Sequence, residues 1–201
     1  MFIEHREIEL KQRARRPQRI GRLTWAVPTI ILAALLGGCA TPARVDQMKV
    51  DTPTGTRTAI ASTAMKEAVA IGQVSGGKDT NPLWMSNIST ADFERALQDS
   101  LQSAGLLAPD RQNCRVRLTA QLLSLDQPFF GADMTVTASV LYTLVDCASK
   151  KEVWVKTITL PYTAKFGDSL LGVERLKLAN EGAARVNIAK LVELLAEFKP
   201  Q

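Results

Sequence analysis

The sequence predicts an α+β domain, an antiparallel-rich sheet of about four strands with two helices on one face (order β-α-β-β-β-α), after a signal peptide and a flexible tether. Three observations predict it: a short apolar run near the N-terminus, a capped amphipathic segment at 89–104, and three strand-like segments after residue 115, two of which alternate between apolar and polar residues. Alternation is typical of strands with one buried face, and spacings of three and four are typical of helices. We expect one α+β domain over 61–201.

The first 38 residues have the charge order of an export signal. Arginines precede an apolar run from Ala26 to Leu36, and small residues follow it. A helix that spans a bilayer needs about 20 apolar residues, so this run is too short. We interpret 1–38 as a signal peptide that is removed; an ordinary signal cut elsewhere and a short uncut anchor are the alternatives. Residues 39–60 are rich in Thr, Pro and charged residues without periodicity, which predicts the tether.

The segment Leu36-Gly37-Gly38-Cys39 resembles the lipobox of bacterial lipoproteins. The resemblance implies lipidation of Cys39, which in that family carries a thioether-linked diacylglycerol and usually a third acyl chain. Two acyl chains already anchor a protein stably to a membrane. Ala40 stands where lipoproteins retained at the inner membrane of enteric bacteria have an aspartate. The resemblance therefore implies a lipid anchor in the outer membrane, facing the periplasm.

Loss of the signal peptide changes the composition of the chain. Of 25 basic and 20 acidic residues, 7 and 3 lie in the signal, so 18 and 17 remain and the mature part is close to neutral. This balance argues against a nucleic-acid partner. His5, the only histidine, is lost as well, which excludes histidine-dependent triads and histidine-containing zinc sites. We expect no catalytic residue, no metal site and no cofactor.

The elements follow in chain order. Val69, Ile71 and Val74 predict a first strand, with a helix over 63–71 as the alternative. The segment 89–104 predicts a helix, with Ser89 as N-cap and the left-handed C-cap position after it at a glycine. Alternation predicts strands within 116–122 and 134–144. Residues 152–162 are rich in Val, Thr, Ile and Trp and follow a hairpin-loop segment, which predicts a further strand. A seam of apolar residues predicts a last helix over 173–198.

Two motifs suggest catalysis and fail closer inspection. Gly167-Asp168-Ser169-Leu170 matches the nucleophile motif of the GDSL hydrolases, but that family requires a later Asp-x-x-His and no histidine follows here. We interpret it as a turn before a helix. Asp126 and Asp133 flank a hairpin loop, where aspartates more often serve turn formation than acid–base chemistry.

Cys114 and Cys147 stand at the ends of two strands that we expect to pair as a hairpin, which places them close together. An oxidising compartment favours a disulfide. Against it, strand alternation directs the two side chains to opposite faces unless a bulge shifts the register. A disulfide and two separate thiols both stay open.

The candidate contact surface consists of aromatic side chains in loops. Phe129 and Phe130 occupy the predicted hairpin tip, and Trp84 lies in the loop 78–84. Exposed, they would contact a partner or a bilayer; the alternative is that they fold under and close the end of the core.

The mature domain as a whole resembles the small outer-membrane lipoproteins of the YajG-like kind, and more distantly the lipopolysaccharide-assembly lipoprotein. The likeness lies in the lipobox, the stretch from Gly76 to Trp84, the loop Asp126-Gln-Pro-Phe-Phe-Gly131 and the stretch 172–184. It carries no active site. It implies a non-enzymatic envelope lipoprotein that binds a protein or lipid partner in envelope assembly or transport, of open oligomeric state. The alternatives are a structural subunit of a secretion or transport complex and a carboxylate-dependent enzyme acting on the envelope.

Overall fold

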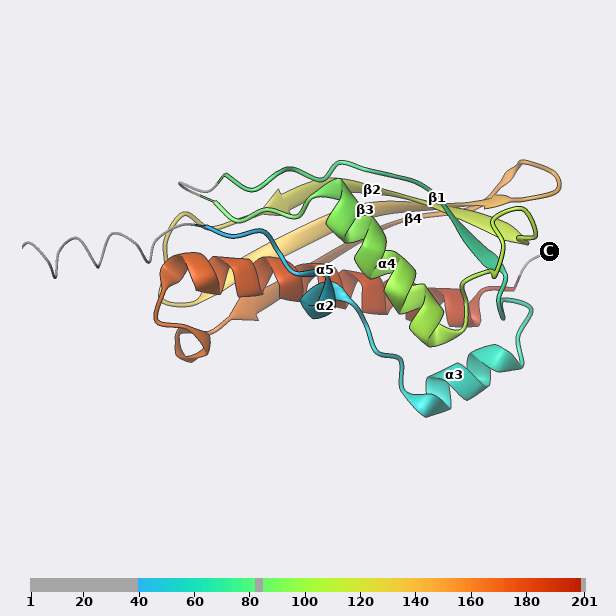
Figure 1. The fold of residues 1–201 in the computed structure, drawn as a ribbon, viewed down its shortest axis with the longest axis horizontal. Helices are drawn as coiled ribbons and strands as arrows, with labels where there is room; N and C mark the ends of the chain where they lie inside the picture. Colours follow the sequence, from blue (N-terminus) through green and yellow to red (C-terminus); the bar gives the residue numbers. More distant parts are fainter. Residues whose placement is uncertain (1–39, 82–84, 200–201) are drawn as a thin grey trace, which may run out of the picture. The chain divides into compact units, whose positions relative to one another are not determined.

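A four-stranded sheet in the order β1-β2-β3-β4 forms the centre of the computed structural model, which describes residues 40–81 and 85–199 (Figure 1). The predicted signal peptide, Cys39 and Trp84 lie outside the described residues. The strands are β1 Val69–Ser75, β2 Val116–Asp126, β3 Met134–Asp146 and β4 Glu152–Ala164. β2, β3 and β4 pair antiparallel, whereas β1 runs parallel to β2. A four-stranded, antiparallel-rich sheet is confirmed.

Two long helices connect and cover the strands. α4, Thr90–Ala104, links β1 to the parallel strand β2, and α5, Gly172–Glu197, follows β4 (Figure 1). The Oγ of Ser89 accepts a hydrogen bond from the backbone N–H of Asp92 at 3.1 Å, and Gly105 ends α4 with a φ of +72°. The predicted caps of this helix are confirmed.

The core lies between the sheet and these two helices. Its largest fully buried side chains include Phe93 of α4, Leu118 of β2, Tyr142 of β3 and Ile188 of α5. α5 approaches the sheet closely, because a Cβ at Gly182 would lie within 2.2 Å of two carbon atoms of the Tyr162 ring. The other face of the sheet is polar, since the outward residues of β2 and β3 are mostly Thr, Ser, Gln and Arg. These contacts place both long helices on one face of the sheet.

We expected a flexible tether over 39–60, but the described part of this segment, from residue 40 on, is packed on the domain. It contains two further helices before β1, α2 (Val45–Met48) and α3 (Thr54–Ala61). Met48 and Ile60 are fully buried in the core. Burial of these two side chains stabilises the packing of the segment on the domain, although the segment contains few large apolar residues. Arg44 donates three hydrogen bonds to the buried carboxylate of Glu181 on α5. Within residues 40–81 and 85–199 the structure therefore has four helices where we expected two, with a 3-10 turn at Phe166–Asp168.

Candidate functional site: an apolar end of the domain

Two loops at one end of the sheet expose large apolar side chains. They are the β2–β3 loop, 127–133, and the β4–α5 loop, 165–171, at the left of Figure 1. Five of the eight large hydrophobic side chains exposed among the described residues belong to them, and we call these five the apolar end: Phe129, Phe130, Phe166, Leu170 and Leu171. Contiguous apolar exposure of this kind marks interaction sites on soluble domains.

Phe129 and Phe130 do not close the end of the core. They are 89% and 88% exposed. The neighbouring part of the core is formed instead by residues that include Met134, Ala164 and Leu176. The interpretation that the two rings plug the core is wrong, and both remain available for contact.

A carboxylate joins the two loops. Asp133 in the β2–β3 loop accepts hydrogen bonds from the Nζ of Lys165 and from the backbone N–H of Phe166, each at 3.0 Å. The hydrogen bond from Lys165, followed by the one from Phe166, holds the pKa of Asp133 below its ordinary value. The two loops are therefore one surface rather than two independent tips.

A nearly buried guanidinium group lies beneath the same loops. Arg175, in the first turn of α5, is 6% exposed. It donates to the carbonyl oxygen of Ser169 at 2.6 Å and to that of Gly131 at 3.2 Å, one in each loop. Its guanidinium also lies over the ring of Phe166, 5.0 Å from the centroid, in a cation–π contact. Arg175 thus fixes the backbone that carries the apolar end.

The three aspartates weighed as catalytic candidates do not form a reactive pair. Asp133 is engaged with Lys165 and Phe166 as described, and the Oδ2 of Asp168 accepts from the backbone N–H of Lys165 at 2.7 Å. The GDSL-like segment overlaps the 3-10 turn that precedes α5, as its interpretation as a turn predicts. Asp126 ends β2, where it pairs with Thr137 of β3. Within the described residues, no cluster of three or more His, Cys, Asp or Glu could hold a metal ion.

Two hollows of the surface lack either the volume or the apolar lining of a usual small-molecule site. A groove lined by Gly76, Ile88 and Leu122 measures about 160 Å³. A wider hollow of about 370 Å³ lies on the open polar face of the sheet, between Gln73, Gln121 and Thr143. Small-molecule sites usually occupy roughly 300–1,000 Å³ and are mostly apolar. The apolar end is therefore the stronger candidate.

The chain enters the described structure at the same end (Figure 1). The Nζ of Lys177 donates a hydrogen bond to the Oγ1 of Thr41 at 3.1 Å. The Oγ of Ser86 donates one to the carbonyl oxygen of Thr41 at 2.8 Å. Gln127, the first residue of the β2–β3 loop, donates in turn to the carbonyl oxygen of Ser86 and to the Oδ1 of Asn180. A chain of hydrogen bonds thus joins Thr41 to the loop that carries Phe129 and Phe130.

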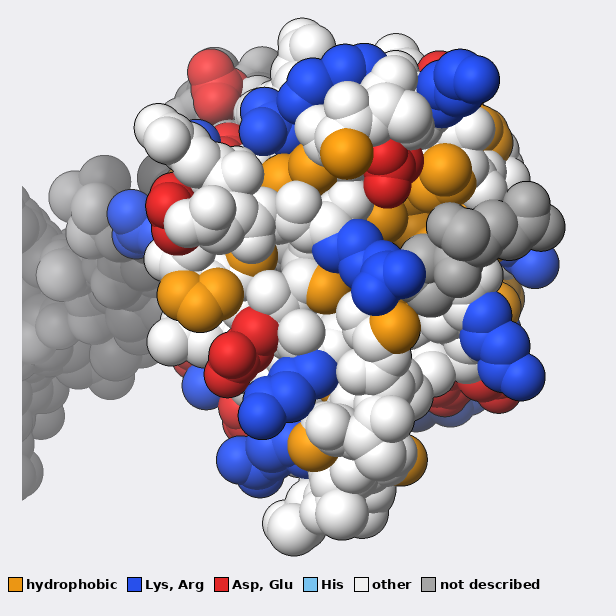
Figure 2. Space-filling model, turned by 90° about the vertical axis from the view of Figure 1, so that its right-hand side faces the viewer, with side chains coloured by type: hydrophobic (Ala, Val, Ile, Leu, Met, Phe, Trp, Pro, Cys, Tyr) orange, Lys and Arg blue, Asp and Glu red, His pale blue; other side chains and the backbone are white. Residues whose placement is uncertain are grey.

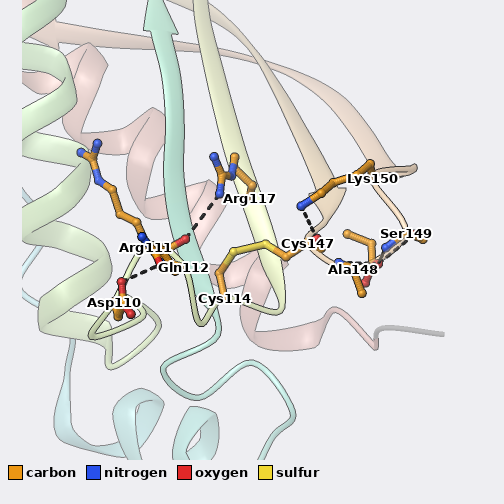
Figure 3. Close-up of a disulfide and its surroundings, with 10 residues drawn as sticks. Asp110, Arg111, Gln112, Cys114, Arg117, Cys147, Ala148, Ser149 and Lys150 are labelled. Atoms are coloured by element: carbon orange, nitrogen blue, oxygen red, sulfur yellow. Dashed lines mark hydrogen bonds between the residues drawn. A yellow bond between two sulfur atoms is a disulfide. The ribbon is translucent and has the colours of Figure 1, made fainter.

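A disulfide closes the opposite end of β2 and β3. Cys114 and Cys147 are bonded, with their Cα atoms 6.0 Å apart (Figure 3). Val116 pairs with Asp146, so the register differs by one residue from the expected one, which set Cys114 opposite Cys147. Both cysteines lie just beyond the ends of the paired strands, where alternation no longer fixes the side chain to one face. This explains how the bridge forms despite the alternation of the strands.

The sequence identified two of the five side chains of the apolar end. Phe129 and Phe130 stood out as adjacent aromatic residues in a hairpin tip. It did not identify Phe166, Leu170, Leu171 or Arg175, because the β4–α5 loop meets the β2–β3 loop only through tertiary contacts. The one local signal was the presence of large apolar residues on both sides of the turn residues Gly167, Asp168 and Ser169.

The fold and the site define a class, an α+β domain with helices on one face of an open sheet and an apolar loop surface at one end. No part of the described chain forms a helix that has both the length and the apolar character needed to cross a membrane.

No family model matches the chain, and no curated protein matches it. Among solved structures, the chain is similar to protein XCC0632 from Xanthomonas campestris, of the family DUF330, with 12% identity, a TM-score of 0.51, and coverage of 67% of this chain and 88% of that one. Two further matches have lower TM-scores. The PelC dodecamer from Paraburkholderia phytofirmans is 19% identical (TM-score 0.46, 69% and 93% covered), and a minor lipoprotein from Acinetobacter baumannii is 9% identical (0.43, 66% and 94%). At these identities the likeness concerns the fold alone.

Proposed function

We propose that the protein is a lipid-anchored lipoprotein of the YajG-like kind, held in the outer membrane and facing the periplasm, that binds a protein or lipid partner and catalyses no reaction. The observation that carries the proposal is the apolar end, a fixed surface whose largest side chains are open to solvent. The lipobox that ends at Cys39 supports the anchor.

The disulfide supports the compartment. Disulfides persist in oxidising environments such as the periplasm and are rare in the cytosol. The Cys114–Cys147 bridge is held within a well-formed end of the sheet, where the backbone N–H of Cys147 donates to the carbonyl oxygen of Arg115 at 2.9 Å. A bridge in such a position favours export of the domain.

The apolar end can supply binding free energy. Burying one Phe or Leu side chain contributes about 1.5–3 kcal/mol, and Phe129, Phe130 and Leu170 are each more than four-fifths exposed. Since association also costs rotational and translational freedom, covering these three side chains alone supports weak to moderate binding. The permanent anchor makes moderate affinity sufficient, because it confines the protein to the membrane surface.

Mass spectrometry of the protein isolated from membranes tests the anchor. We expect a mature chain that begins at Cys39 and carries three acyl chains, and a Cys39→Ala variant that loses them. An unlipidated chain that retains residues 1–38 would contradict the proposal.

Crosslinking in cells tests the binding. We expect the full-length chain to capture a specific envelope component, and the double variant Phe129→Ser/Phe130→Ser to lose it. A matched control, Val153→Ser/Val155→Ser, removes exposed apolar side chains of β4 and should leave capture intact. A folded, lipidated protein that captures nothing would count against partner binding. Loss of the protein's function in cells in a folded Asp126→Asn, Asp133→Asn or Asp168→Asn variant would point to catalysis instead.

A further inference from the structure

The anchor and the apolar end lie close together. Thr41 is hydrogen-bonded within this end of the domain, through Ser86 and Lys177. Thr41 is two positions after Cys39, with only Ala40 between them, and two extended residues reach at most about 7 Å. An acylated Cys39 therefore brings the apolar end to the surface of the bilayer.

The domain cannot move away from that surface on a flexible tether. Residues 40–61, which would form the tether, are fixed by the buried side chains of Met48 and Ile60 and by the hydrogen bonds of Arg44 to Glu181. The carboxylate of Glu181 is 2% exposed, so detaching this segment would leave a charge unpaired in the interior. The packed segment keeps the distance between the anchor and the apolar end short.

We infer that the apolar end lies in the headgroup layer of the bilayer that holds the anchor, with Phe129, Phe130 and Leu170 inserted among the lipids. The inference rests on the proposed function, because only a lipidated Cys39 places this end at a bilayer. It identifies the partner of this surface as the lipid surface rather than another protein.

The distribution of side chains fits this orientation. Aromatic side chains are favoured at membrane interfaces, and apolar faces there enter about 5–10 Å into the headgroup and acyl boundary. Lys165, whose side chain is two-thirds exposed, lies beside Phe166, where an ammonium group can reach lipid phosphates. The opposite end presents several Lys and Arg side chains, with acidic and other polar groups and smaller hydrophobic patches between them (Figure 2). The most exposed large apolar side chains therefore lie at the apolar end, whereas the opposite end is mixed in character.

Site-specific labelling of the lipidated full chain tests the inference. The chain has three cysteines; with Cys39 acylated and Cys114 bonded to Cys147, a new cysteine is the only free thiol. We would label Phe130→Cys, Leu170→Cys and the control Val153→Cys, an exposed apolar position at the start of β4, with a polarity-sensitive fluorophore. Each labelled protein is then inserted into phosphatidylethanolamine–phosphatidylglycerol vesicles with brominated acyl chains. Mass spectrometry of each variant verifies the native disulfide and the acyl chains.

The expected result is a blue-shifted emission and severalfold stronger quenching at positions 130 and 170 than at 153. Equal, weak quenching at all three positions in a lipidated protein would overturn the inference and leave the anchor intact. Absence of acyl chains on Cys39 would instead refute the proposed function, so the two failures are distinguishable. A protein partner identified by crosslinking can then be added to the labelled vesicles. If its addition abolishes the quenching at positions 130 and 170, the surface belongs to that partner and the inference is wrong.

Discussion

The two ends of the sheet are stabilised in different ways. At the β3–β4 turn, the Cys114–Cys147 disulfide joins the ends of β2 and β3 (Figure 3). The carboxylate of Asp146 accepts hydrogen bonds from the backbone N–H groups of Ala148 and Ser149 and from the Ser149 hydroxyl. At the apolar end, no disulfide joins the described residues, and the two loops are held together by hydrogen bonds of Asp133 and Arg175. The disulfide end therefore needs no partner to hold its structure in water.

The comparison separates stability from function at the apolar end. Its fixed parts, Asp133 and Arg175, lie beneath or between the loops, whereas Phe129, Phe130 and Leu170 make no contribution to the core. The fold does not require these side chains, yet they stay exposed to water on a fixed backbone. Such exposure indicates a surface that a binding partner covers. Four measurements can break or sharpen this division.

Removal of the disulfide should give the largest effect. The bridge spans 33 residues in sequence, and the chain-entropy model gives about 3–4 kcal/mol of stabilisation for a loop of this length. We expect the double variant Cys114→Ser/Cys147→Ser to lose this amount in the free energy of unfolding, measured with urea. Addition of a reductant should lower the stability of the wild type and leave that of the variant unchanged. A loss below about 1 kcal/mol would show that the turn around Asp146 suffices without the bridge.

Replacement of Arg175 should give the next largest effect. Its guanidinium donates to one carbonyl of each loop and contacts Phe166, and hydrogen bonds of charged groups contribute about 1.5–3 kcal/mol. We expect Arg175→Met to lower the free energy of unfolding by about 2 kcal/mol, in line with the loss of buried polar contacts, and to make both loops sensitive to proteolysis. Arg117 is the matched control, because it is exposed and donates to the carbonyl oxygen of Arg111 at the disulfide end; Arg117→Met should change the stability by less than about 0.5 kcal/mol. Equal effects of the two variants would contradict the role assigned to Arg175.

The exposed rings themselves should matter little for stability. Phe129 and Phe130 contact mostly water, so we expect Phe129→Ser/Phe130→Ser to shift the free energy of unfolding by less than about 0.5 kcal/mol. The same variant should lose its crosslinked partner or its insertion into lipid. A loss of 2 kcal/mol or more, which is roughly the value for burial of an apolar side chain, would show that the rings belong to the core.

The strands and the long helices of this fold were predictable from local sequence. Alternation over 116–122 and 134–144 reports which side chains face the helices, because strand geometry repeats every two residues, and the inward residues are buried as expected. The caps of α4 are likewise local, since Ser89 and Gly105 act on the adjacent turn. The residues of these elements and their immediate neighbours are therefore sufficient to predict them.

The N-terminal helices and three of the five side chains of the apolar end were not predictable in this way. α2 has four residues and one buried side chain, Met48, which is too short for any periodicity. Its attachment depends on Arg44 and Glu181, which are 137 residues apart in sequence. The contact between Asp133 and Phe166 is also long-range. Neither contact leaves a pattern in the neighbouring residues, so only the folded chain reveals a packed segment in place of a tether.

The pH dependence of the two ends should give the smallest effect and the finest test of the comparison. Hydrogen bonds from Lys165 and Phe166 hold the pKa of Asp133 below its ordinary value of 3.8, and the backbone and hydroxyl of Ser149 do the same for Asp146. A carboxyl whose pKa is lower in the folded state stabilises the fold above pH 3.8, and this contribution is lost as the pH falls through the folded value. Titration of both carboxyl groups by NMR should show Lys165→Met raising the pKa of Asp133 alone, and Ser149→Ala raising that of Asp146 alone. Added salt should raise the pKa of Asp133 more, because the charge of Lys165 is screened whereas the donors on Asp146 are neutral. If Asp133 titrates at its ordinary value in the wild type, its contacts with Lys165 and Phe166 do not persist in solution, and Arg175 alone would join the two loops.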